Sequence, residues 1–97
     1  MINENNAVSL FLLKLKSKKR DDLTVRQLLV LIELQYRPQT VRGLAETLDM
    51  QKPVITRAMD KLCGDSLAAR MPDHQDRRSV ILRITPSGKK FLKECGL

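Results

Sequence analysis

The sequence is poor in the residues that build metal, redox and catalytic sites. Its 97 residues include one histidine and two cysteines, and Cys63 and Cys95 stand too far apart to form a CxxC pair. Such a set does not supply the usual ligands of a zinc site. A glycine-rich phosphate loop, a catalytic carboxylate pair and a Ser/His/Asp set are also missing. We therefore expect no metal, no cofactor and no enzymatic activity.

Aromatic residues and long apolar runs are scarce as well. With no Trp, one Tyr and two Phe, aliphatic side chains must supply the core. The most apolar stretch, residues 7–15, is too short to span a bilayer. Its basic residues follow it, which is the wrong order for a signal peptide. We expect a cytoplasmic protein with no membrane contact, in which the cysteines are reduced thiols; a thiol redox switch is the alternative.

What the sequence has in excess is positive charge. Eighteen Lys and Arg stand against eleven Asp and Glu, a net charge of +7. Ten of these cations but only four of the acids lie between Met50 and Lys93. A small protein with this balance usually meets a polyanion. The chain length allows one modest core, so we expect a single domain over residues 1–97.

The first 20 residues predict a helix with an apolar stripe. Val8, Phe11, Leu12 and Leu15 follow the spacing i, i+3, i+4, i+7, which places them on one helix face. Two interpretations remain open for this face. It makes a dimer contact, or it completes the core of the monomer.

Clear start signals mark the next helices. Thr24 and Gln27 have the spacing of a capping box, in which each side chain bonds the backbone amide of the other residue. Proline at position 38 ends that helix. Thr40 can cap a third, short helix, and Pro53 is placed to occupy the first position of a fourth helix over residues 52–63. Two helices joined by a three-residue turn, the second with a polar, basic outer face, indicate a helix-turn-helix.

The period of the apolar residues changes after Gly64. Residues 67–71 and 79–84 alternate as strands do, and a polar loop joins them. Thr85 and Pro86 then begin a last helix. A hairpin after a recognition helix is a wing, so the sequence predicts a mainly α fold with a small β-hairpin wing, a winged helix-turn-helix, with its core in residues 24–92.

Residues 24–92, about 70% of the chain, resemble the MarR family of bacterial transcription regulators. The matching motifs are Leu44-Ala45-Glu46 with Leu48, Lys52 to Arg57 with Asp60-Lys61-Leu62, Leu67 to Arg70, and Asp73, Asp76-Arg77-Arg78, Ile84-Thr85 and Gly88. The Asp-x-Arg pair followed by Thr-x-x-Gly is the specific part of this pattern. The resemblance implies a sequence-specific regulator of transcription, a repressor, that binds double-stranded DNA.

The resemblance also implies roles for particular residues. Helix 52–63 would enter the major groove and the wing, residues 72–79, would reach the minor groove. Arg78 would be the minor-groove probe, Asp76 its support, and His74 a solvated wing residue. For Arg57, a surface ion pair with Asp60 is the alternative to a base contact. The candidate DNA-binding residues are Thr40, Gln51, Lys52, Pro53, Val54, Thr56, Arg57, Lys61, Arg70, His74, Arg77 and Arg78.

The chain also departs from the family pattern. Ser66 stands where the family usually has glycine, and we expect Gly64 to supply the bend instead. Only about 20 residues precede the core, so we do not expect a full small-molecule effector pocket. A homodimer through the first helix stays a hypothesis. The alternative function is a winged-helix module that binds protein rather than DNA.

Overall fold

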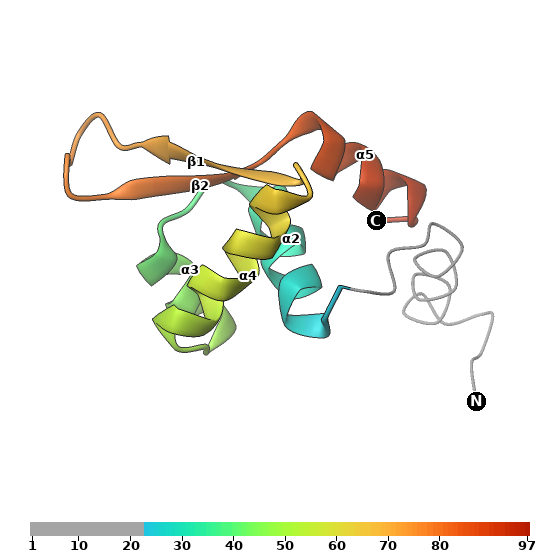
Figure 1. Ribbon diagram of the computed structural model, residues 1–97, viewed down its shortest axis with the longest axis horizontal. Helices are drawn as coiled ribbons and strands as arrows, with labels where there is room; N and C mark the ends of the chain where they lie inside the picture. Colours follow the sequence, from blue (N-terminus) through green and yellow to red (C-terminus); the bar gives the residue numbers. More distant parts are fainter. Residues whose placement is uncertain (1–22) are drawn as a thin grey trace.

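The computed structural model describes residues 23–97 (Figure 1). The helix expected around residues 8–15, with its dimer candidates, lies outside these residues. Along the described chain the elements are α2 (Val25–Tyr36), α3 (Val41–Leu48), α4 (Lys52–Gly64), β1 (Ala68–Pro72), β2 (Val80–Ile84) and α5 (Pro86–Glu94). The expected order of helices and hairpin, and with it the winged-helix architecture, is confirmed.

Threonine caps start three of the four described helices. Thr24 Oγ1 accepts from the Gln27 amide at 3.1 Å, and the Gln27 side chain accepts from the Thr24 amide at 2.8 Å. This is the expected capping box. Thr40 and Thr85 cap α3 and α5 by accepting from the amide three residues later. Each cap satisfies a backbone donor that the helix cannot pair.

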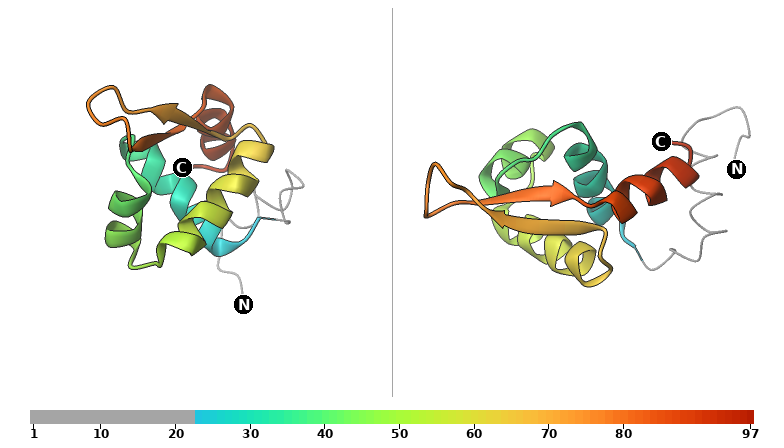
Figure 2. Two further views of the ribbon diagram at one scale, coloured as in Figure 1. Left: turned by 60° about the vertical axis from the view of Figure 1, so that its left-hand side comes forward. Right: turned by 90° about the horizontal axis from the view of Figure 1, so that it is seen from above.

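Aliphatic side chains form one core between the helices and the inner side of the hairpin. α2 packs on α4, α3 and β2, and α4 packs on α3 and β1. In Figure 2 the hairpin loop extends at one end of the described chain and α5 lies at the other. The core residues that are fully or almost fully buried include Val30, Leu31, Leu34, Leu44, Ile55, Met59, Leu62, Leu67, Leu82, Leu92 and Cys95.

A third segment extends the hairpin sheet. β1 and β2 pair antiparallel, with Ala68 opposite Ile84 and Pro72 opposite Val80. Gln39, between α2 and α3, forms an isolated bridge to β2. Its amide donates to Leu82 O at 3.1 Å, and its carbonyl accepts from Leu82 N at 2.7 Å. These two bonds fix the base of the wing to the helices that carry the site.

The turn after α4 corrects one expectation. Gly64 is the last residue of the helix, and Ser66 takes the left-handed conformation with φ of 61°. Leu67 N donates to Leu62 O at 2.9 Å and Ser66 N to Cys63 O at 3.0 Å. This pair of bonds is the Schellman motif, whose left-handed position usually holds glycine. Ser66 adopts this strained backbone conformation because the two hydrogen bonds satisfy carbonyl groups of the last helical turn.

The start of α4 differs slightly from the expectation too. The helix begins at Lys52, so Pro53 occupies its second position rather than its first. Asp49, with φ of 52°, ends α3 and turns the chain toward α4. The three-residue turn that the sequence predicts is thus present, and it sets the two helices of the motif against each other.

Candidate nucleic-acid interface

The outer face of α4 is polar and open to solvent. Its inner face is buried through Ile55, Ala58, Met59 and Leu62. The helical period places Pro53, Thr56, Arg57 and Asp60 on the opposite side, and all four are exposed. Gln51 precedes the helix without capping it, so its amide group is not held by the helix start. The face therefore presents hydrogen-bonding groups that can contact a partner.

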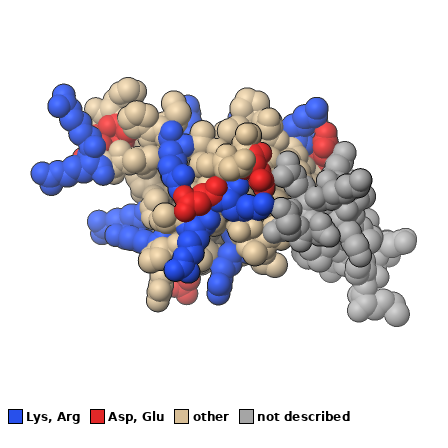
Figure 3. Space-filling view, viewed as in Figure 1, with Lys and Arg blue, Asp and Glu red and all other residues tan. Residues whose placement is uncertain are grey.

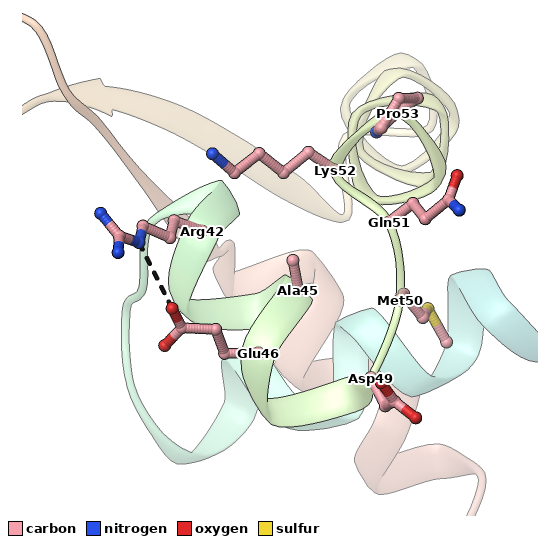
Figure 4. A pocket seen from close by; sticks show the side chains of 8 residues that line it. All are labelled: Arg42, Ala45, Glu46, Asp49, Met50, Gln51, Lys52 and Pro53. Carbon is pink, nitrogen blue, oxygen red and sulfur yellow. Dashed lines mark hydrogen bonds and ion pairs between the residues drawn. The ribbon is translucent and has the colours of Figure 1, made fainter.

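An open groove lies between α3 and the start of α4 (Figure 4). Lys52 reaches from α4 toward the side of α3 that carries Arg42, whose Nε lies 3.3 Å from Glu46 Oε1. The sequence analysis did not include Arg42. A spacing of four residues, as between Arg42 and Glu46, is that of an ordinary ion pair on an exposed helix face, so the sequence holds no signal that Arg42 lies beside the start of α4. The groove is lined by Arg42, Ala45, Glu46, Asp49, Met50, Gln51, Lys52 and Pro53.

Arg70 links the wing to α4. Its Nη2 lies 2.7 Å from Asp60 Oδ1 and 3.5 Å from the Thr56 carbonyl oxygen. The side chains are 38% and 66% exposed, so the pair contributes no more than about 0–1 kcal/mol to stability. Its larger effect is electrostatic, because it neutralises the one carboxylate on the outer face of α4. Asp60 thus binds Arg70 and not Arg57.

The wing loop is ordered by two aspartates. Asp73 Oδ1 accepts from the Gln75 amide at 2.9 Å, and Asp76 Oδ1 accepts from the Arg78 amide at 2.9 Å. Both are turns in which a carboxylate bonds the backbone two residues on. The carboxylates thus face their own loop, and the side chains of Arg77 and Arg78 are exposed beyond it. The turn bond expected of Asp76 is present, and Asp73 makes a second one.

The remaining candidates lie at the edges of this face. Thr40 is half-buried as the cap of α3. Val54 is half-buried and, with Arg57, lines a small hollow against the start of α2. Lys61 lies 3.3 Å from Asp65 Oδ2 in an ion pair. His74 is exposed in the wing. A DNA contact by any of these residues stays a prediction.

Basic side chains cover much of the face that α3, α4 and the hairpin form (Figure 3). From the charge count alone we expected nearly the whole excess of positive charge to lie in residues 50–93, the half of the chain that would face DNA. Arg83 and Lys89 instead line a separate hollow with Arg37, at the end of α2. Within residues 23–97 the basic side chains therefore lie on more than one surface, and the hollow at the end of α2 is separate from the helix-turn-helix.

Residues 23–97 lack the features of two other kinds of site. His, Cys, Asp and Glu do not gather there in a group of three that could hold a metal ion. No described helix has the length and apolar composition to cross a membrane.

Comparison with known proteins places this geometry in a family. The profile of the MarR family matches residues 23–80. The multiple antibiotic resistance protein MarR of Salmonella typhimurium is 28% identical over 75 residues, which are 76% of this chain and 52% of the relative. The chain thus spans about half the length of the curated relatives it matches.

Solved structures agree in fold. The transcriptional regulator BldR from Sulfolobus solfataricus aligns with a TM-score of 0.74 and 33% identity, over 88% of this chain and 60% of that one. A MarR variant from E. coli, solved in complex with operator DNA, aligns with a TM-score of 0.77 and 25% identity, over 89% and 60%. With the family profile covering more than half of its residues, the chain belongs to the MarR family.

Proposed function

We propose that this chain binds double-stranded DNA in a sequence-specific manner and regulates transcription as a repressor. The observation that carries the proposal is the outer face of α4. This face is exposed and polar, and its one carboxylate, that of Asp60, is paired with Arg70. It lies beside a wing in which Arg77 and Arg78 are exposed. A related fold has been solved with operator DNA. The chain acts by binding, in the bacterial cytoplasm, and performs no catalytic step.

In this mode α4 lies in the major groove. Arg57 donates two hydrogen bonds to a guanine, and Gln51 pairs with an adenine. Lys52, beside Arg42 in the groove, contacts phosphate and sets the register. The wing follows the backbone to the minor groove, where Arg78 enters a narrow A·T-rich segment of strong negative potential. Asp76 orients Arg78 and makes no contact with DNA.

Repression follows from occupancy, because a bound regulator excludes other proteins from a promoter. A homodimer of this chain would read two half-sites about one helical turn apart. An inverted repeat in DNA fragments selected from a random pool would establish that symmetry.

Binding to duplex DNA should weaken steeply as salt rises. Each phosphate that a Lys or Arg neutralises releases counterions, and log K falls with log[salt] by about 0.9 per phosphate. For four to six contacts we expect a slope of roughly −4 to −5. Fluorescence anisotropy of a labelled duplex across a salt series measures it. A flat response would instead favour the protein-binding module.

Replacing Arg78 by alanine should weaken binding roughly tenfold, a loss of about 1.4 kcal/mol, when the wing lies over A·T pairs. The same change should cost far less on a duplex whose flanks are G·C, since the wide groove offers a weaker potential. The affinities of the unaltered chain and of the Arg78→Ala variant are measured on both duplexes, and the four values are compared. Arg77→Ala serves as the control of equal charge in the same loop, and equal losses on both duplexes would contradict insertion of Arg78.

A further inference from the structure

The hollow at the end of α2 gathers three basic side chains from separate parts of the chain. Arg37 is the residue after α2, Arg83 lies on β2 and Lys89 lies in α5, and all three are exposed. They line one cavity of about 370 Å³, and no Asp or Glu lines it in the described part of the chain. None of the ion pairs within residues 23–97 includes any of the three. The hollow is therefore a cluster of positive charge that no described carboxylate neutralises.

The ends of the neighbouring helices balance only a small part of this charge. α2 ends at Tyr36, and the carbonyl end of a helix carries about half a negative charge, which attracts cations. Lys89, however, is the fourth residue of α5. The start of a helix carries about half a positive charge, so this place is unfavourable for a lysine. About two to three positive charges thus remain unbalanced at the hollow.

An aromatic ring lies at the rim of the same hollow. Tyr36 lines the cavity and is 78% exposed, so its ring is open to a ligand. Such a ring offers a stacking surface to a planar group. Leu34, Pro38 and Ile84 add apolar atoms to the lining. The volume also falls within the range of small-molecule sites, about 300–1,000 Å³. The hollow thus joins an anion-binding part to an aromatic and apolar part.

We propose that this hollow binds a nucleoside monophosphate, with the phosphate among Arg37, Arg83 and Lys89 and the base stacked on Tyr36. A phosphate monoester carries about −1.5 to −2 charges at pH 7, which nearly matches the unbalanced charge. A carboxylate carries a single charge and would leave half or more of it unmatched. The two guanidinium groups can each donate two parallel hydrogen bonds to phosphate oxygens. The site is independent of the proposed DNA-binding function and lies on another surface.

Calorimetric titration tests the ligand class with three probes, which are AMP, ribose 5-phosphate and adenosine. AMP should bind most tightly. Ribose 5-phosphate lacks the base and should bind at least roughly fivefold more weakly, since stacking of a base on an aromatic side chain contributes that much or more. Adenosine lacks the phosphate and should give no measurable heat. No binding of AMP at millimolar concentration, or equal affinities for AMP and ribose 5-phosphate, would overturn the proposal.

Exposed-residue variants place the ligand in this hollow. Arg83→Ala should weaken AMP binding roughly tenfold, because the phosphate loses a charged hydrogen-bond donor. Tyr36→Ala should weaken the binding of AMP but not that of ribose 5-phosphate. Arg42→Ala is the matched control, since it removes the same charge from an exposed site on α3, and it should leave the affinity for AMP unchanged. Equal losses in the Arg83→Ala and Arg42→Ala variants would show attraction by net charge alone and overturn the proposal.

The backbone of DNA is another source of phosphate, and salt dependence separates the two sources. If the hollow lies off the DNA, Arg83→Ala combined with Lys89→Ala should leave the slope of log K against log[salt] for a duplex unchanged. A slope shallower by about 0.9 for each lost contact would assign the hollow to the DNA interface and overturn the proposal. The calorimetry contains no DNA. A chain that bound AMP but no duplex would therefore contradict the proposed function and leave this site in place.

Discussion

Gly88→Ala should lower the free energy of unfolding by about 3 kcal/mol, the upper end of the usual cost of overpacking. Gly88 is buried near the start of α5. A Cβ there would overlap the carbonyl oxygen of Leu67 and lie 2.6 Å from Ile84 Cγ1. The oxygen belongs to backbone and cannot turn aside. Since about 1 kcal/mol shifts the melting temperature of a domain of this size by 4–8 °C, thermal unfolding should show a fall of roughly 12–24 °C.

The overlap cannot be relieved by a small shift of α5, because the helix start is bonded at several points. Thr85 Oγ1 donates to Ser66 O at 2.7 Å, and Thr85 N donates to Leu67 O at 3.1 Å. The Gly88 amide donates to Thr85 Oγ1 at 3.0 Å. Moving α5 away from Leu67 would stretch these bonds together.

Gly64→Ala is the matched control. An added Cβ at Gly64 meets no atom within 4 Å, and the residue is helical. Alanine should therefore stabilise the chain by up to about 0.5–1 kcal/mol. If Gly88→Ala melted as high as Gly64→Ala, the close packing of α5 on the turn at Leu67 would be wrong.

The features that the sequence predicted well are local ones. Thr24, Thr40 and Thr85 each bond a backbone amide three residues away, so a few neighbouring residues determine each helix start. The apolar spacing of α4 likewise places Ile55, Met59 and Leu62 in the core without knowledge of the rest of the fold. The first strand was expected one residue early at both ends, and the second was expected to start one residue early but to end at Ile84, where it does.

The features that the sequence did not predict depend on residues far apart in the chain. Arg70 meets Asp60 only because β1 runs beside α4. Arg83 and Lys89 follow the recognition helix in sequence but lie with Arg37 in space. A charge count along the chain cannot separate the two surfaces. Ser66 was missed for a different reason, because the two bonds of its turn outweigh the usual preference for glycine at that position.

The second large effect is expected from Arg57→Ala, on sequence discrimination. A bidentate contact from arginine to guanine is worth about 1–3 kcal/mol, or roughly 5- to 150-fold in affinity. The variant should lose that factor on a duplex selected by the wild-type chain. It should lose much less on a duplex in which the contacted guanine is replaced. Competition titrations with both duplexes, at one salt concentration, measure the difference.

Arg83→Ala is the control for this experiment, because it removes the same charge from the other basic surface. It should weaken binding to both duplexes slightly and equally, through the long-range field alone.

Arg57 is suited to a specific role since Asp60, its nearest candidate partner in sequence, is bound by Arg70 at 2.7 Å. The guanidinium is therefore not held by that carboxylate. A loss that is equal on both duplexes would show that Arg57 contacts phosphate, and base recognition by α4 would then have to come from Gln51 and Thr56.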